Sequence, residues 1–219
     1  MTIMEAMEQR HSVRQFENRP IDTETVDKLN AEIATINKES GLHIQLFTEE
    51  PEAFQGNKPS YGQFSGCRNY FAMVGKKGMD EAVGYYGERL VLFAQMLGLN
   101  TCWVALTYKK GKVAPDEEQG EKLYIVVALG YGKTQGVSHK LKTESDISDA
   151  GADAPDWYKA GLKAALLAPT AMNQQKFKFA RNGNTISAKP GLGFYTKIDL
   201  GIVKNHFEIG AGKSNFKWK

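Results

Sequence analysis

The stretch Arg10-His11-Ser12-Val13-Arg14 places two guanidinium groups, an imidazole and a hydroxyl within five residues. Each guanidinium can donate a pair of hydrogen bonds to phosphate oxygens, and the serine hydroxyl adds another donor. This concentration of donors predicts a site for a ligand that carries a phosphate. The alternative is an ordinary basic surface patch, because clustered cations usually face solvent. A second stretch, from Ala168 to Gln175, bears on the choice between them.

The composition is that of a soluble globular protein. Of 219 residues, 42% are hydrophobic and 24% are charged, which suits one domain or two merged halves with a buried core. The formal net charge of +3 is too small to indicate nucleic-acid binding by itself. Cys67 and Cys102 share no C-x-x-C spacing, which excludes a disulfide framework and fits a reducing compartment. No apolar run reaches membrane-spanning length and no signal peptide is evident, so we expect a cytoplasmic protein that does not engage membranes.

The first part of the chain predicts helices and strands in alternation. Apolar spacing predicts a short opening helix that runs into Arg10, a helix from Asp22-Thr23 to Gly41, and a long helix from Asp80 to Gly98. Alternating or continuous apolar runs predict strands at 43–47, 70–74, 101–104 and 123–129. The segment 51–66 is rich in Gly, Pro, Ser and Asn, which predicts a loop able to cover a site.

A similar order of elements follows. Asp153 can cap a helix that has Pro155 in its first turn and ends before Pro169, with an inward face predicted at Trp157, Ala160, Ala164 and Leu167. A hairpin over 177–188 turns at Asn182-Gly183, and a closing helix covers 199–209. Both passes run helix, strand, strand, long helix. This order indicates either a duplicated fold or chance, since the sequence identity between the passes is negligible.

Several catalytic motifs are absent from the sequence. It has no nucleophile elbow, no Walker lysine loop and no His-Glu-x-x-His, and its four histidines are too dispersed to predict a metal site. His43 and His206 are therefore expected to be packed or rim residues. We expect a bound cofactor to perform the chemistry, with the protein holding and tuning it.

Five stretches together resemble the nitroreductase family of FMN flavoproteins. Arg10 to Phe16 resembles the family's opening motif, and Leu167-Ala168-Pro169-Thr170-Ala171-Met172-Asn173-Gln174-Gln175 its Ala-Pro-Ser-Ala-x-Asn-x-Gln segment. The others are similar to its Gly-Leu-Gly-Thr-Cys-Trp turn, the strand and turn beyond it, and its late basic pair; they lie at 97–103, 126–132 and 139–142. In most members the Ala-Pro-Ser segment lies in the first quarter of the chain, whereas here it lies in the last.

In the position of this segment the chain is similar to a divergent branch of nitroreductases. In that branch one chain repeats the fold and mimics the usual dimer. The resemblance implies an α+β, nitroreductase-like fold with an antiparallel or mixed central sheet flanked by helices. It implies two pseudo-repeated halves, 1–149 with the phosphate motif and 150–219 with the Ala-Pro-Thr segment, merged into one domain. The chain would then act as a monomeric pseudo-dimer or as a homodimer, and either one or two flavins could bind.

The resemblance implies a role for each of the matching residues. Arg10, Ser12 and Arg14 would hold the FMN phosphate and ribityl chain, with His11 beside them, and Lys140 and Lys142 would approach the same phosphate. The alternative for these lysines is a solvated surface pair. Pro169, Thr170, Ala171 and Asn173 would line the isoalloxazine ring, although Asn173 could instead be a capping residue. The backbone of Val104, Ala105 and Leu106 would face N5, where the family often has an acidic residue and a glycine.

The resemblance implies an enzyme in which NAD(P)H gives hydride to flavin N5 and a nitroaromatic or quinone takes it, with no catalytic side chain required. Tyr61, Phe64 and Trp103 are available as flat cover for the ring, or as simple packing. The departures at Ala105 and Leu106 leave open a flavin-storing protein with little turnover. A third hypothesis is a basic nucleic-acid module, based on the pI of 8.7 and on aromatics between lysines in the tail 213–219. The acidic residues spread through the chain argue against that module, so no nucleic-acid partner is expected.

Overall fold

The computed structural model describes residues 1–55, 62–149, 151 and 153–219. Its α-helices are α1 Ile3–Gln9, α2 Thr23–Ser40, α3 Asp80–Met96, α4 Glu144–Ile147, α5 Asp156–Leu166 and α6 Thr196–Ala211. Its strands are β1 Gln45–Phe47, β2 Asn69–Lys76, β3 Asn100–Val104, β4 Glu121–Gly130, β5 Phe177–Asn182, β6 Thr185–Pro190 and β7 Lys217–Trp218. Short 3-10 helices lie at Pro51–Ala53, Lys110–Lys112, Ala171–Asn173 and Lys213–Asn215.

The chain divides into two compact units, each built from segments that are separate in the sequence. The first unit contains Met1–Glu8, Asp80–Arg89 and His139–Lys219, and the second contains Gln9–Met79 and Leu90–Ser138. Helix α3 therefore gives its first part to one unit and its last part to the other. The α+β class expected from the sequence is confirmed. The predicted halves 1–149 and 150–219 are repeats of one fold, which the division into compact units does not test, so they stay a prediction.

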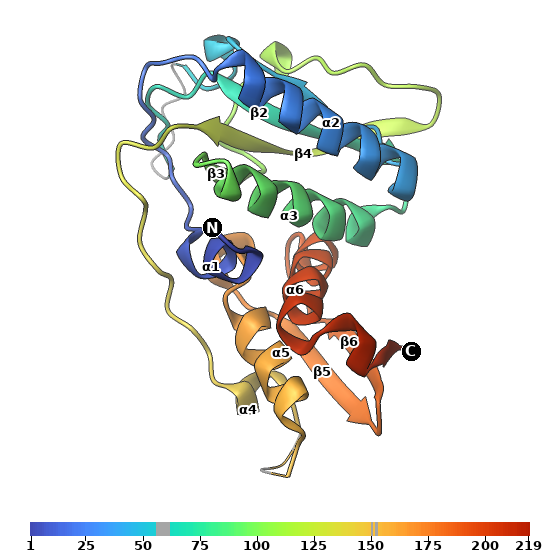
Figure 1. The fold of residues 1–219 in the computed structure, drawn as a ribbon. Coiled ribbons are helices and arrows are strands. Elements are labelled where there is room, and N and C mark those ends of the chain that lie inside the picture. The colour runs from blue at the N-terminus through green and yellow to red at the C-terminus, as the bar shows by residue number, and fades with distance from the viewer. Residues whose placement is uncertain (56–61, 150, 152) are drawn as a thin grey trace. The chain divides into compact units, whose positions relative to one another are not determined.

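The second unit is built on a four-stranded antiparallel sheet in the order β1-β2-β4-β3. Helix α2 runs alongside this sheet (Figure 1). All of β2 is buried except its last residue, and β4 is buried from Ile125 onward, so both faces of the central strands are covered. This explains why the two strands are continuous apolar runs instead of alternating ones. Phe16, Phe54, Tyr70 and Val126 belong to the core cluster here.

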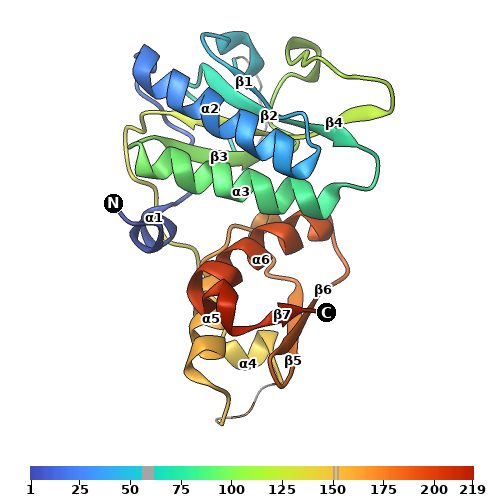
Figure 2. The ribbon, with the colours of Figure 1, turned by 45° about the vertical axis from the view of Figure 1, so that its right-hand side comes forward.

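The first unit packs α5 and α6 together beside the small sheet β5-β6-β7 (Figure 2). Aromatic rings fill its core around Phe207, which stacks on Phe179 at 4.7 Å between ring centroids and meets Tyr158 edge-on. Phe216 and Trp218 join the same cluster, and the Trp218 Nε1–H donates to Glu208 Oε1 at 2.6 Å. The tail aromatics are thus core residues, which removes the feature that suggested stacking on bases.

Helix α6 is buried on almost every side, and several of its polar residues are paired. His206 and Glu88 are both fully buried, and their Nε2 and Oε1 atoms lie 2.9 Å apart. The Tyr85 hydroxyl donates to Glu208 at 2.6 Å, and burial is the main cause that raises the pKa of Tyr85. The expectation that His206 is a packed residue is therefore confirmed.

Two glycines let α3 and α6 approach closely in a reciprocal way. A Cβ on Gly84 would collide with the carbonyl of Ile198, and a Cβ on Gly201 would collide with the carbonyl of Glu81. Ile198 lies three residues before Gly201, and Glu81 lies three residues before Gly84. Each helix therefore presents the same backbone position to the other glycine.

Most helix ends follow the expected signals. The Asp22 side chain accepts from Thr25 N at the start of α2, and Gly41 ends the helix with φ +71°. For α5 the expected cap was wrong, because Pro155 rather than Asp153 precedes the first turn. Of its expected inward face, Ala164 is buried, Trp157 and Leu167 are half-buried, and Ala160 is exposed. The buried residues of α5 are Tyr158, Gly161, Leu162, Ala164, Ala165 and Leu166. Helix α6 starts three residues earlier than expected, at Thr196.

Candidate functional site

The residues predicted from the sequence fall into two groups, one in each unit. The second unit holds Arg10, His11, Ser12, Arg14, Val104, Ala105 and Leu106. The first unit holds Lys140, Lys142, Pro169, Thr170, Ala171 and Asn173. We call residues 10–16 the arginine segment and residues 169–175 the proline–asparagine segment.

The arginine segment is an extended strand-like piece rather than a helical turn. Ser12 forms a parallel bridge with Thr101 at the edge of β3, and the Val13 N–H donates to the Thr101 carbonyl at 3.0 Å. Farther on, the Ser65 N–H donates to the Arg14 carbonyl and the Phe16 N–H to the Ser65 carbonyl, at 3.0 and 2.8 Å. Main-chain bonds thus fix the segment, together with the buried side chains of Val13 and Phe16.

The donor side chains of this segment are near enough to Cys102 in β3 to act on its thiol. Burial raises the pKa of Cys102, while the positive charge of Arg14, the Ser12 hydroxyl and the charge of Arg10 all act in the opposite direction. Arg10 is buried, Arg14 is half-buried and Ser12 is exposed. The structure therefore brings the three predicted phosphate donors together around one point of the sheet edge.

Three further residues at this point were not assigned from the sequence. Among the described residues, the buried Thr101 Oγ1 has no hydrogen-bond partner, although its backbone pairs with the arginine segment. Gly136 has φ +74°, and a Cβ there would lie 2.8 Å from the Cβ of His11. A Cβ on Gly62 would lie 3.6 Å from Arg14 Nε. Only the threonine hydroxyl, next to the recognised Cys-Trp turn, offered a signal in the sequence.

The predicted N5-facing residues follow β3 directly. Val104 is the last residue of the strand and is buried, Ala105 is half-buried, and Leu106 is 73% exposed. Position 106 thus presents a large apolar side chain to solvent where the family often has a glycine.

The proline–asparagine segment has an unusual backbone. Met172 and Asn173 both have φ +52°, and Gln175 has φ +45°. Residues other than glycine rarely adopt such left-handed conformations, and they persist only where the surroundings impose them. Strain of this kind concentrates at ligand-binding sites, so the segment is a functional candidate on geometry alone.

Side chains impose this backbone from two directions. Asp199, in the first turn of α6, accepts from the Ala171 N–H at 2.9 Å and from Gln174 Nε2 at 2.8 Å. Gln174 Nε2 also lies 2.7 Å from the Phe194 carbonyl. Burial raises the pKa of Asp199 to about 6, and the two amide donors oppose that rise.

Gln175 holds the other side of the segment. Its Oε1 accepts from the Lys142 N–H at 2.9 Å, and its Nε2 donates to the Lys140 carbonyl and to Asn173 Oδ1, both at 2.8 Å. The Gln175 N–H donates to Thr170 Oγ1 at 3.0 Å. The Lys142 ammonium donates to the Gln175 carbonyl at 2.9 Å, so this lysine supports the proline–asparagine segment directly.

Asn173 and Lys140 differ from these anchors. Asn173 is exposed, and its Nδ2 donates to the Lys140 carbonyl at 2.9 Å. The Lys140 side chain is exposed as well. Asp199 and the two glutamines were not predicted as site residues; the glutamines belong to the recognised motif, whereas nothing in the sequence marked Asp199.

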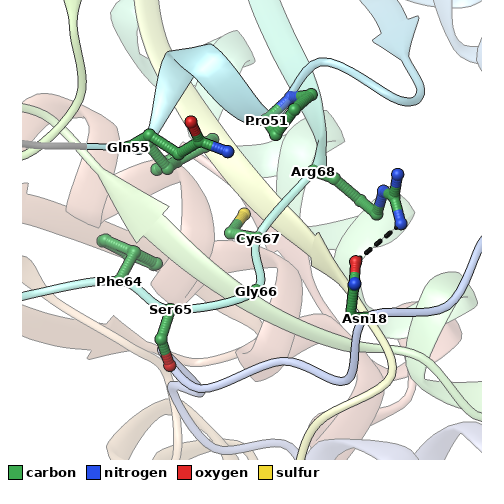
Figure 3. A pocket seen from close by; sticks show the side chains of 9 residues that line it. Asn18, Pro51, Gln55, Phe64, Ser65, Gly66, Cys67 and Arg68 are labelled. Carbon is green, nitrogen blue, oxygen red and sulfur yellow. Dashed lines mark hydrogen bonds between the residues drawn. The ribbon is translucent and has the colours of Figure 1, made fainter.

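A small cavity of about 310 Å³ lies in the second unit, beside the arginine segment (Figure 3). Phe54, Phe64 and Pro51 supply apolar walls, and the Arg68 guanidinium donates to Asn18 at 2.7 Å on the polar side. None of the residues predicted to hold the phosphate or to face N5 lines it, and neither does any residue of the proline–asparagine segment. Phe64, expected to be available as ring cover, is a wall of this cavity and packs on Phe54; Trp103 is half-buried in β3. Tyr61 lies outside the described residues.

In the part of the chain that the structure describes, no helix is long and apolar enough to cross a membrane. Cys67 and Cys102 are both buried, and they form no disulfide.

Comparisons with known proteins point to one family. The model of the family described as "Putative TM nitroreductase" matches residues 2–211. None of the curated proteins matches the chain.

Two solved structures have the same fold as this chain. A putative nitroreductase from Thermotoga maritima is 22% identical, with a TM-score of 0.70 over 98% of this chain and 85% of that one. A putative NADH dehydrogenase/NAD(P)H nitroreductase from Bacteroides thetaiotaomicron is 16% identical, with a TM-score of 0.51 over 66% of this chain and 95% of that one. A nitroreductase with bound FMN from Bacteroides fragilis is 18% identical, with a TM-score of 0.45 over 71% and 97% of the two chains.

Proposed function

We propose that this chain, which belongs to the nitroreductase family whose model spans residues 2–211, is an FMN-dependent oxidoreductase that oxidises NAD(P)H and reduces small nitroaromatic or quinone acceptors. The observation that carries the proposal is the convergence of Arg10, Ser12 and Arg14 at one edge of the four-stranded sheet. When bound, FMN supplies hydride transfer at its N5 atom, so no catalytic side chain is needed from the protein.

The arginine segment fits a phosphate monoester. Main-chain bonds fix the backbone that carries the two guanidiniums and the serine hydroxyl. The buried Thr101 hydroxyl next to this backbone lacks a partner among the described residues. Each hydrogen bond between a charged group and its partner contributes about 1.5–3 kcal/mol. Arg10, Ser12 and Arg14 would hold the phosphate and ribityl chain, with His11 at their side and Lys140 as a further cation.

The proline–asparagine segment fits a planar ring. Its backbone is locked in a conformation that leaves Asn173 exposed, with amide groups that can pair with the pyrimidine edge. Pro169, Thr170 and Ala171 supply the adjoining surface. The backbone after Val104 would supply the N–H that faces N5, and a backbone donor does not depend on which side chain stands at Ala105 or Leu106.

The reciprocal approach of α3 and α6 at Gly84 and Gly201 supports the further proposal that the chain repeats the fold within itself. Both passes also run helix, strand, strand, helix, as α2-β1-β2-α3 and α5-β5-β6-α6. The unbonded cysteines fit the reducing cytoplasm as its compartment.

Purification with FMN and titration of flavin fluorescence test the cofactor. We expect the purified protein to be yellow, or to bind added FMN with one saturating phase. Steady-state oxidation of NADH and of NADPH with a quinone should then reach at least about 1 s⁻¹, within the ordinary range of enzymes. Binding without turnover would support flavin storage instead, and a colourless protein that neither binds FMN nor oxidises NAD(P)H would end the proposal.

A further inference from the structure

Asp199 presents both of its carboxylate oxygens to the proline–asparagine segment. Its Oδ1 accepts from the Ala171 N–H at 2.9 Å, and its Oδ2 accepts from Gln174 Nε2 at 2.8 Å. The residue is 4% exposed and lies in the first turn of α6, a helix buried along most of its length. Two acceptors on a rigid helix therefore fix two points of one short segment.

The segment needs such an anchor because its backbone is strained. Met172 and Asn173 lie between the two points that Asp199 holds, and both have φ +52°. Met172 is 84% exposed, so packing of its side chain does not impose this conformation. The hydrogen bonds that bracket the two residues account for it.

We propose that the Asp199 carboxylate is a positioning residue that holds 171–174 in the shape that receives the flavin ring, and that protonation of this carboxylate releases the segment. The inference rests on the proposed function for its ligand. The hydrogen bonds to Asp199 are present in the protein by itself, so the positioning role is testable without flavin.

The environment of Asp199 explains why it can titrate in an accessible range. Burial raises its pKa to about 6 from the ordinary value of 3.8, and the two amide donors lower it. In the part of the chain that the structure describes, no charged side chain is found to hydrogen-bond to this carboxylate. The titratable groups on the elements around it are Lys140 and Lys142 beside Gln175, Lys176 beside Gly193, Tyr195 and Lys197 on its own helix, and Glu81, which is paired with Lys204.

The sign of the pH effect separates positioning from stability. Because the pKa in the folded state lies above the unfolded value, protonation of Asp199 favours the folded chain as pH falls through about 6. The two amide donors, by contrast, favour the ionised carboxylate, so protonation weakens their bonds to it. On lowering the pH we therefore expect the segment to loosen while the contribution of this group to global stability rises.

Hydrogen exchange on the flavin-free chain is the first test. Between about pH 7.5 and about pH 5, after correction for the intrinsic rate, protection of the amides of Ala171, Asn173 and Gln174 should fall about tenfold in the natural protein. In Asp199→Asn, which keeps the size but not the charge, protection should be low at both pH values. Asp27→Asn, at an exposed position on α2, should behave like the natural protein. Equal protection in Asp199→Asn and the natural protein would overturn the inference.

FMN titration is the second test, with riboflavin run in parallel. Asp199→Asn should raise the Kd of both flavins about tenfold or more and remove the step near pH 6. Gln174→Ala, which keeps the carboxyl, should show a smaller increase and retain the step, and it serves if Asp199→Asn does not fold. If the natural protein binds no flavin, the proposed function fails while the exchange result still decides the positioning role. Unchanged Kd values in folded Asp199→Asn would refute the link to the ring.

Discussion

The arginine segment and the proline–asparagine segment achieve order in opposite ways. Residues 10–16 have no positive φ, and main-chain bonds to Thr101 and Ser65 hold them. The segment 169–175 has a left-handed backbone that side chains hold, chiefly Asp199 and Gln175. Where the main chain fixes the shape, replacing an arginine side chain leaves those main-chain bonds in place. Where side chains fix the shape, each anchor is also a stability residue, and the two kinds of mutation should separate accordingly.

The largest expected effect is on the stability of the proline–asparagine segment. Gln175→Ala removes an acceptor for the Lys142 N–H and donors to Lys140 and Asn173 at a position that is 3% exposed. We expect the free energy of unfolding to fall by about 3 kcal/mol, because buried polar groups lose their partners. Denaturant unfolding measures this. Gln15→Ala, an exposed glutamine of the arginine segment, is the matched control and should change stability by less than about 0.5 kcal/mol. Equal losses in both variants would contradict the comparison.

Next in size is the effect of Arg14→Ala on flavin affinity. We expect the Kd of FMN to rise about tenfold to a hundredfold, through the loss of one or two charge-assisted bonds of about 1.5–3 kcal/mol. Riboflavin, which lacks the phosphate, should show little change. Paired fluorescence titrations give both values, together with a melting curve that should stay close to that of the natural protein. A parallel loss for the two flavins would mean that Arg14 does not contact the phosphate.

The two lysines provide a finer test. Lys142→Ala removes the ammonium that donates to the Gln175 carbonyl, so it should weaken FMN and riboflavin binding alike, by about 1 kcal/mol. Lys140→Ala removes an exposed cation and should weaken only FMN binding, by about 0.5–1 kcal/mol. The same titrations at low salt measure both effects. If Lys142→Ala weakened the binding of FMN but not of riboflavin, Lys142 would instead be assigned to the phosphate.

The smallest expected effect is a gain. Met172→Gly relieves a left-handed residue whose side chain is 84% exposed, and we expect the protein to become more stable by about 0.5 kcal/mol, since the relief of strain is partly offset by backbone entropy. Met4→Gly, in the first turn of α1 and 41% exposed, should instead destabilise by up to about 1 kcal/mol. Thermal melting compares the two. A loss of stability in Met172→Gly would show that the left-handed backbone is not strained.

Sequence patterns predicted the elements whose signals are local. The Asp22 cap and the Gly41 stop each depend on a few adjacent residues, and the structure has both. The hairpin is present as well, but its turn is Gly183-Asn184, one residue later than expected, because Asn182 still pairs with Thr185. The face of α5 was misjudged because Gly161, a residue without a side chain, lies in the packed stripe. The opening helix was placed correctly, yet it buries Ala6 and Met7 while Ile3 and Met4 stay exposed.

Candidate site residues could be predicted where their functional groups are concentrated in adjacent positions of the sequence. Arg10, Ser12 and Arg14 are recognisable because their donors are concentrated, and the structure groups them. Asp199 was not recognisable, because its role depends on a contact with Ala171 and Gln174 across about 25 residues of chain. An aspartate in the first turn of a helix ordinarily interacts with the helix dipole, and nothing local distinguishes this one.

The reciprocal packing of Gly84 and Gly201 takes place inside a single polypeptide. An equivalent crossing between two identical subunits would dissociate on dilution, and every substitution would occur twice, once on each side of the axis. Within one chain the crossing is insensitive to dilution, and either side can change alone. Under the proposal that the chain repeats the fold, one half would keep the cationic donors and the other the rigid, side-chain-anchored turn, without requiring both features of every copy.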